Sequence, residues 1–220
     1  MTPFIQIAGI KSYNEARMIL DLGADLIGFP LKLDHHAEDV TDDEAADIIQ
    51  KLNQPKKCCL ITYLDQAKDI HTLCTKLGVL TVQLHGDVVV DELIELKKLN
   101  PAYKIIKSLI VKNNNLDELK NQITKLSPHC DMFITDTFDP DTGACGATGK
   151  THNWDVSKTL VDLSKKPIIL AGGLMPDNVA EAIKHVEPYG VDVHTGVEDE
   201  LGDKDALLVE TFVKTVRIDF

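Results

Sequence analysis

The sequence predicts an α/β fold, a (β/α)8 TIM barrel formed by a single domain over residues 1–220. Short apolar runs alternate eight times with longer segments of helical period. Two of these runs, residues 58–61 and 168–170, contain no polar side chain, as expected for strands of a parallel sheet that is buried on both faces. Eight such units close naturally into a barrel, and an open doubly wound sheet is the alternative arrangement.

The eight strands and eight helices follow from the spacing of apolar residues. Strands are predicted at residues 4–8, 25–29, 57–63, 79–84, 104–110, 132–135, 167–171 and 191–194. Helices are predicted at residues 12–22, 41–52, 65–77, 88–99, 115–126, 154–164, 176–186 and 204–216.

Three helix starts carry additional signals. Ser12 with Glu15, and Thr41 with Glu44, have the spacing of a capping box, in which the first side chain and the acidic residue satisfy each other's backbone N–H groups. Pro176 suits the first turn of a helix, because its missing N–H has no partner to lose there. These signals support the proposed division into strands and helices.

Composition and charge exclude several classes of partner. The formal net charge is −12 and the isoelectric point is about 5.0, which argues against binding to nucleic acid or to an anionic membrane surface. No run approaches the roughly 18 apolar residues of a membrane span. The five cysteines are odd in number and form no CxxC pair, so we expect reduced thiols and a cytoplasmic protein.

Three glycine-rich turns follow predicted strands, at residues 143–150, 171–173 and 195–197. Glycine lets the backbone approach an anion closely, and helix N-termini direct free N–H groups toward it. In a barrel of this type the phosphate is commonly held after the seventh and eighth strands, where the last two turns lie. The turns therefore predict a phosphate site, although glycines in tight turns also have a purely structural explanation.

Several motifs occur together and in a fixed order along nearly the whole chain. They are IQIAGI (5–10), VQLHG (82–86), GATGKT (146–151), AGGL (171–174), PDNV (176–179), VD (191–192), TGVE (195–198) and GDKD (202–205). In this combination the sequence resembles the phosphoribosylanthranilate isomerase family.

The resemblance implies a (β/α)8 barrel that catalyses the Amadori rearrangement of phosphoribosylanthranilate in tryptophan biosynthesis, with no metal or organic cofactor. Such a reaction needs an acid that protonates the furanose ring oxygen and a base that removes the proton from C2. The resemblance places the family's aspartate acid at Asp136, which ends the sixth predicted strand. An alternative role for Asp136 is to order the loop that follows it.

Two positions depart from the family pattern. The family's cysteine base precedes the Gly-Ile pair after the first strand, where this chain has Ala8, which cannot remove a proton. After the second strand the family carries an arginine suited to the anthranilate carboxylate, and here Glu38 falls near that place. A carboxylate there is expected to repel anthranilate, because charges of the same sign face each other.

For phosphate binding, the resemblance and the turns together indicate four direct candidates, with two further residues ordering the neighbouring loop. The direct candidates are Gly172, Gly173, Thr195 and Gly196, and the ordering residues are Thr148 and Gly149.

Other polar residues lie at predicted strand ends. His85 follows the fourth strand and is expected to project toward the pocket as a second catalytic candidate, or else to order its loop. Asp34, His35 and His36 follow the second strand, and with His85 and Asp136 they offer a rival set of ligands for a divalent metal. Their spacing matches no ligand motif, so the prediction remains that there is no metal.

Four residues are candidates to replace the missing base: Cys145 in the loop after the sixth strand, His194 beside the last glycine turn, and Lys11 or Tyr13 just after the first strand. For Cys145 the competing interpretation is a partly exposed thiol without a role.

The sequence therefore predicts an isomerase of the phosphoribosylanthranilate isomerase type that binds a small phosphorylated sugar, with Asp136 and His85 as catalytic residues. Two alternatives stay open. One is a paralogue that acts on another sugar phosphate, with or without a metal. The other is a barrel that binds a sugar phosphate without catalysis. The oligomeric state is left open.

Overall fold

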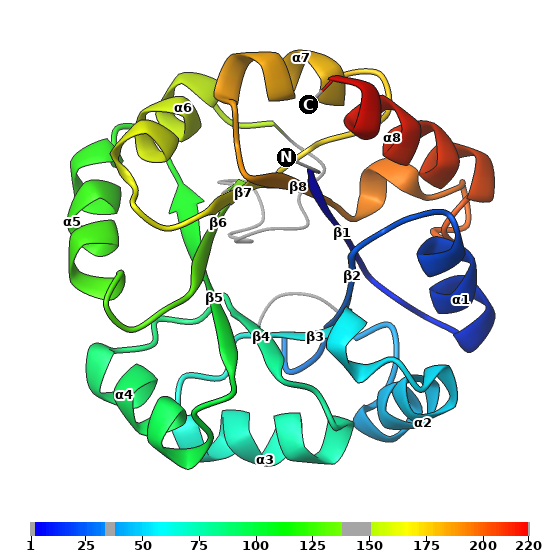
Figure 1. The fold of residues 1–220 in the computed structure, drawn as a ribbon, viewed down its shortest axis with the longest axis horizontal. Helices are drawn as coiled ribbons and strands as arrows, with labels where there is room; N and C mark the ends of the chain where they lie inside the picture. The colour runs from blue at the N-terminus through cyan, green and yellow to red at the C-terminus, as the bar shows by residue number, and fades with distance from the viewer. Residues whose placement is uncertain (1–2, 34–37, 138–150, 220) are drawn as a thin grey trace.

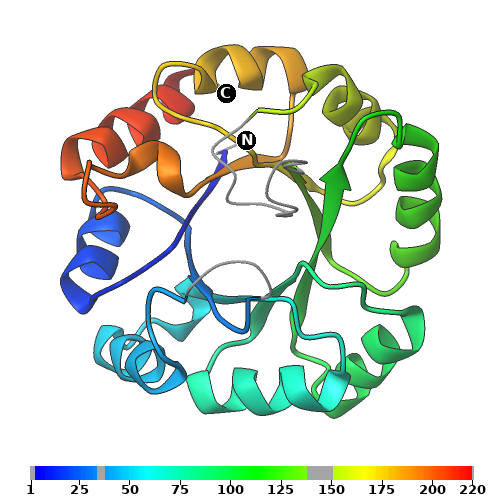
Figure 2. The same ribbon diagram turned by 180° about the vertical axis from the view of Figure 1, so that it is seen from behind.

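A computed structural model describes residues 3–33, 38–137 and 151–219 of the chain. Within these ranges eight parallel strands form a closed barrel in the order β1 to β8, and each strand pairs with its neighbours in the sequence, with β8 pairing β1. Figures 1 and 2 show the barrel from opposite sides, with a ring of helices outside the strands. The predicted (β/α)8 TIM barrel is confirmed, and the doubly wound sheet is excluded.

The strands are β1 Phe4–Ala8, β2 Leu26–Pro30, β3 Cys58–Thr62, β4 Thr81–Leu84, β5 Lys104–Val111, β6 Met132–Thr137, β7 Ile168–Leu170 and β8 Gly190–Val193. The α-helices are α1 Tyr13–Asp21, α2 Asp42–Leu52, α3 Ala67–Leu77, α4 Val90–Leu99, α5 Leu116–Leu126, α6 Trp154–Leu163, α7 Val179–Val186 and α8 Ala206–Asp219. Two 3₁₀ turns, η1 Pro55–Lys57 and η2 Thr195–Val197, complete the described elements.

Some predicted helix starts are wrong. Helix α7 begins at Val179 rather than Pro176, because residues 176–178 form a turn whose Asn178 side chain accepts from the N–H of Met175. The glycine turn at Thr195 starts the short η2, and α8 begins only at Ala206.

The two predicted capping boxes differ in outcome. That of Thr41 and Glu44 is complete. At Ser12 only half forms: its hydroxyl accepts from the N–H of Glu15, but the Glu15 carboxylate accepts from the N–H groups of Lys11 and Lys204.

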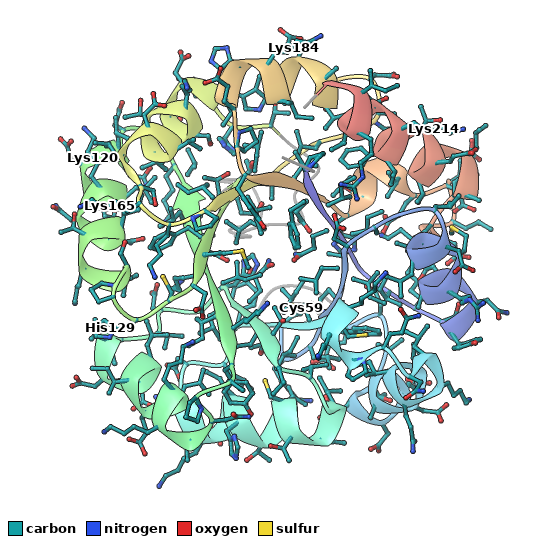
Figure 3. All side chains as sticks on the ribbon, viewed as in Figure 1. Cys59, Lys120, His129, Lys165, Lys184 and Lys214 are labelled. Atoms are coloured by element: carbon teal, nitrogen blue, oxygen red, sulfur yellow. The ribbon has the colours of Figure 1, made fainter. Side chains whose placement is uncertain are left out.

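Apolar side chains form two cores. The larger one fills the space between strands and helices and includes Phe29, Phe133 and Phe212. The smaller one lies inside the barrel and consists of Ala8, Leu26, Cys59, Ile61, Ile106, Ile134, Ile169 and Ala171. In Figure 3 the labelled Cys59 lies inside the ring of helices, whereas the labelled lysines Lys120, Lys184 and Lys214 lie on its outer surface.

Because the strands are tilted, inward-facing side chains from alternate strands stack in layers. The register places Gly28, Gln83, Ile134 and Asp192 of the even-numbered strands in one layer, which we call the carboxylate layer. Toward the carboxyl ends of the strands, Ala8, Ile61, Ser108 and Ala171 form the next layer, which we call the small-residue layer. His85, Asp136 and His194 each lie two residues beyond a member of the carboxylate layer, at the rim.

In the part of the chain that is described, no helix is long and apolar enough to cross a membrane.

Candidate active site

Asp136 lies near the carboxyl end of β6, where strand pairing to Ile110 of β5 fixes its backbone. Only 6% of the residue is exposed, and one carboxylate oxygen accepts a hydrogen bond of 2.7 Å from the N–H of Thr137. Burial raises the pKa of Asp136 to about 7, against the lowering effect of that hydrogen bond. A carboxyl group with this pKa is partly protonated at neutral pH and can therefore act as a proton donor.

His85 follows β4 directly and is buried at the same rim. Its Nε2 lies 2.7 Å from the side-chain amide nitrogen of Gln83, and its ring lies against that of Tyr63 with centroids 5.5 Å apart. The structure thus brings His85 and Asp136 to the mouth of one barrel, as the sequence predicts.

Asp192 is a second buried carboxylate inside the barrel, and it is absent from the residues selected from the sequence. It lies on β8, paired in register with Gln6 of β1. Burial raises the pKa of Asp192 to about 7, and the negative charge of Asp136 adds to this effect, while the side chains of Gln6 and Lys204 oppose it. The sequence signal for Asp192 is a polar residue at an inward-facing position of a strand that is otherwise apolar.

Gln6 and Gln83 connect these groups across the barrel. The amide nitrogen of Gln6 donates a hydrogen bond of 2.7 Å to the side-chain oxygen of Gln83, and Gln83 in turn contacts His85. Both glutamines are buried. Two glutamine side chains inside a barrel core are costly unless they are hydrogen-bonded, so they form a polar network among apolar neighbours.

Ala8 ends β1 in the small-residue layer and is buried next to Gly28 of β2. A β-carbon on Gly28 would lie 3.3 Å from that of Ala8 and 2.5 Å from a side-chain carbon of Ile61. The small side chain of Ala8 supplies no group that can move a proton.

Gly172 and Gly173 follow β7 in left-handed conformations, with φ of +98° and +61°. A β-carbon on Gly172 would lie 2.2 Å from the hydroxyl of Thr137, which contacts Nδ1 of His152 at 3.0 Å. His152 also lies 2.6 Å from the Ser157 hydroxyl, and burial lowers the pKa of this histidine to about 4. Glycine at position 172 is therefore required by both conformation and space.

The glycine turns after β7 and β8 pack directly against each other. A β-carbon on Gly196 would lie 1.9 Å from the carbonyl oxygen of Leu174, so the η2 turn, which includes Thr195, touches the chain just after Gly173. In the described part of the chain, the N–H groups of Gly173 and Leu174 donate to no protein acceptor. Adjacent turns with available N–H groups can hold an anion such as phosphate.

His194 lies over the end of β1, where a β-carbon on Gly9 would be 2.0 Å from its Nε2. That nitrogen is also 3.4 Å from Glu198, which forms a buried ion pair of 2.5 Å with Lys204. Packing on Gly9 and the contact with Glu198 hold this imidazole at the side of the rim.

Glu38 is exposed, and its carboxylate accepts a hydrogen bond from the N–H of Lys32, the second residue after β2. The Nζ of Lys32 pairs with Asp42 at 2.8 Å. Glu38 thus lies close to the carboxyl end of β2 but is held by the backbone of its own loop.

Six predicted site residues lie outside the described ranges. They are Asp34, His35, His36, Cys145, Thr148 and Gly149, together with the first glycine turn. Among the residues that are described, no group of three or more His, Cys, Asp or Glu side chains is arranged to hold a metal ion. The rival metal set depends on Asp34, His35 and His36, so it stays a prediction.

The similarity of this chain to known proteins extends over the whole barrel. A family profile described as N-(5'-phosphoribosyl)anthranilate isomerase matches residues 5–215. N-(5'-phosphoribosyl)anthranilate isomerase 2 of Methanosarcina mazei is 39% identical over 98% of this chain and 95% of its own, and the isomerase of Haloferax volcanii is 33% identical over 97% and 92%. The solved structure of the Pyrococcus furiosus isomerase superimposes with a TM-score of 0.79 at 28% identity, covering 98% and 99% of the two chains.

The profile covers far more than half of the chain, and both sequence relatives exceed 30% identity over almost the full length. The chain belongs to the phosphoribosylanthranilate isomerase family.

Proposed function

We propose that this protein is an isomerase that converts N-(5'-phosphoribosyl)anthranilate into the corresponding 1-amino-1-deoxyribulose 5-phosphate, an Amadori rearrangement in tryptophan biosynthesis. The observation that carries the proposal is the full-length match to the family together with a buried, partly protonated Asp136 at the carboxyl end of β6. Active sites of (β/α)8 barrels are built at this end of the strands.

In this proposal the two described glycine turns hold the substrate phosphate. Gly172 and Gly173 turn the chain after β7, and Thr195 with Gly196 forms the adjoining turn after β8. The predicted Thr148 and Gly149 remain part of the proposed site. A phosphate fixed at this point of the rim leaves the ribose ring facing the centre of the barrel, where Asp136 and His85 lie.

Asp136 then acts as the acid of ring opening. Its proton passes to the furanose ring oxygen as the bond between C1 and that oxygen breaks, which leaves a protonated Schiff base between C1 and the anthranilate nitrogen. Removal of the C2 proton gives an enaminol, and protonation at C1 with loss of the O2 proton gives the ketose. Atoms and charges balance without an external oxidant or reductant.

The direct test is turnover of phosphoribosylanthranilate by the purified protein, followed by carbon-13 NMR at C1, which changes from a ring CH to a CH2 group. Asp136→Asn is expected to reduce kcat by about a hundred- to ten-thousand-fold, because general acid catalysis is lost. For the wild type, kcat/KM is expected to fall as the pH rises through about 7, where Asp136 loses its proton. No turnover by the wild type would contradict the proposed function.

A second candidate function is isomerisation of a phosphorylated aminosugar that lacks the anthranilate carboxylate. The observation that favours it is Glu38 near the carboxyl end of β2, since a carboxylate on the protein disfavours a carboxylate on the substrate. Phosphoribosylaniline, which lacks that group, separates the two functions. A higher kcat/KM for the aniline compound supports the second function, and a higher value for phosphoribosylanthranilate supports the first.

We also place the protein in the cytoplasm as part of this proposal. The described cysteines Cys58, Cys59, Cys74 and Cys130 are free buried thiols, as is usual in a reducing compartment.

A further inference from the structure

We infer that Asp192 is the base that removes the C2 proton of the substrate and delivers it to C1. The substrate reaches it past the short side chain of Ala8, and hydrogen bonds through the amides of Gln6 and Gln83 to His85 position it. This inference rests on the proposed function, because an Amadori rearrangement needs a second proton-transfer group in addition to Asp136.

The position of Asp192 follows from the strand register. It belongs to the carboxylate layer, one layer below Ala8 and two residues before His194 at the rim. The residue is 8% exposed, so its carboxylate is almost fully removed from solvent. One oxygen, Oδ1, is fully buried and has no hydrogen-bond partner among the residues described. A buried carboxylate with an unused oxygen is costly unless a ligand or a proton occupies it.

The small-residue layer, which lies between Asp192 and the rim, is formed mostly by short side chains. Three of its four members are Ala8, Ser108 and Ala171, whose side chains are short. Ser108 also has a buried hydroxyl without a hydrogen-bond partner in the described structure. A sugar carbon bound at the rim can therefore approach the carboxylate layer at this point, with Asp136 above it on β6.

The other titratable groups near the centre are less suited to the C2 proton. His194 is packed on Gly9 and contacts Glu198 at the side of the rim. Cys59 is fully buried, and burial raises the pKa of its thiol well above the ordinary value, so it is not a thiolate at neutral pH. Lys11 contacts the carbonyl oxygen of Gly202 and lies 3.6 Å from Asp203, away from the barrel interior. Tyr13 is part of α1, outside the strands.

Charged groups around Asp192 keep it able to exchange a proton. Burial and the charge of Asp136 favour its protonated form, while Gln6 and the ammonium group of Lys204 favour the carboxylate. The opposing effects bring the pKa of Asp192 to about 7, close to that of Asp136. Two carboxyl groups of similar acidity can hold one proton between them, which is the state that the reaction needs at its start.

The amide chain gives Asp192 a matched partner in each protonation state. Among the described residues, none donates a hydrogen bond to Oε1 of Gln6 or to Oδ1 of Asp192. A proton on Asp192 satisfies both atoms, with Gln6 donating onward to Gln83. When Asp192 is ionised, rotation of both amides lets Gln6 donate to the carboxylate and lets His85 donate to Gln83. Gln6, Gln83 and His85 are therefore positioning residues for this base.

The proton transfers close into a cycle. Asp136 gives its proton to the ring oxygen and later accepts the proton from O2, while Asp192 takes the proton from C2 and returns it to C1. The electron pair of the C2–H bond forms the C1–C2 double bond of the enaminol and then the new C1–H bond. Both carboxyl groups end in their starting states.

The test compares Asp192→Asn with the wild type, using Asp117→Asn on the exposed face of α5 as the matched control. We expect kcat to fall by about a hundred- to ten-thousand-fold, with KM changed by less than about threefold. We also expect a larger primary isotope effect with substrate deuterated at C2. A purely structural role predicts loss of phosphate affinity and no change in the isotope effect.

Ala8→Val is the second variant, because it leaves Asp192 in place but puts a larger side chain in the layer between Asp192 and the rim. If Asp192→Asn fails to fold, loss of turnover in Ala8→Val with unchanged affinity for inorganic phosphate still supports the inference. Turnover within about fivefold of the wild type in a folded Asp192→Asn protein, or in Ala8→Val, overturns it. Absence of turnover by the wild type overturns the proposed function together with the inference, so the two failures are distinguishable.

Discussion

The carboxyl group of Asp136 is held in surroundings that favour its uncharged form. Its pKa is about 7 in the folded protein, whereas the ordinary value is 3.8. The folded state therefore binds more protons than the unfolded state between about pH 4 and pH 7, and the free energy of unfolding falls as the pH rises through this window. Below pH 4 both states are protonated, so no difference remains.

Asp136→Asn is thus expected to raise the melting temperature relative to the wild type at pH 8 and to leave it nearly unchanged at pH 4. The reason is that the amide removes the cost of burying a charge at high pH. Thermal unfolding followed by circular dichroism at both pH values measures this, with Asp117→Asn as the exposed control. Equal melting temperatures for Asp136→Asn and the wild type at pH 8 would contradict the assignment of a buried, destabilising carboxylate.

Single residues differ in how far the sequence predicts them. Asp136 is predictable because it ends an apolar strand inside a recognisable motif. Asp192 also lies in such a motif, but its inward direction depends on the register of β8 against β1, which the sequence does not state. The network from Gln6 through Gln83 to His85 spans 77 residues of sequence at its first contact, so no local pattern indicates it.

At the scale of elements, the turn after β7 links phosphate binding to the acid. Gly172 contacts the hydroxyl of Thr137, the residue after Asp136, and Gly196 packs on Leu174. The order of strands and helices is predictable from apolar periodicity, but the start of α7 is not. The Asn178 side chain accepts from the N–H of Met175, so residues 176–178 form a turn where the periodic pattern predicts the first turn of the helix.

Gly172→Ala is expected to weaken binding of inorganic phosphate by at least about tenfold, because the new β-carbon collides with Thr137 and displaces the turn. Gly78→Ala is the matched control, since Gly78 also has positive φ but a β-carbon there meets nothing within 4 Å. Each variant carries the backbone strain of about 1 kcal/mol for alanine at such a position. Isothermal titration with phosphate distinguishes them, and equal affinities of the two variants would exclude this turn from the phosphate site.

At the scale of the whole molecule, barrel closure depends on residues from both ends of the sequence. The eightfold alternation predicts a barrel, because parallel strands with intervening helices have few other closed arrangements. The alternation does not indicate which side chains hold the first and last elements of the barrel together. In the structure this contact is made by Arg217 of α8, which reaches the loops around β1 and β2.

Arg217 donates to the carbonyl oxygens of Pro3 and Gly23 and pairs with Asp25 at 2.9 Å. The same oxygen of Asp25 accepts from the N–H of Ile5 in β1, so one guanidinium group ties α8 to the amino ends of two strands. Three charge-assisted contacts in a half-buried position are expected to contribute about 2 to 3 kcal/mol to the free energy of unfolding.

Arg217→Met keeps most of the side-chain volume but removes all three contacts, so it is expected to lower the free energy of unfolding by that amount in urea titration. Lys214→Met on the same helix is the matched control, because Lys214 is exposed and its ion pair with Glu210 is a surface i,i+4 pair. Arg217→Lys keeps the positive charge but lacks the planar guanidinium group, so it is expected to recover part of the lost free energy of unfolding.

The contacts of Arg217 lie at the amino ends of the strands, opposite the rim with Asp136. The pH dependence of kcat/KM in Arg217→Met is therefore expected to stay that of the wild type. A change in that profile would show that closure and catalysis are coupled, contrary to this division between the two ends of the barrel.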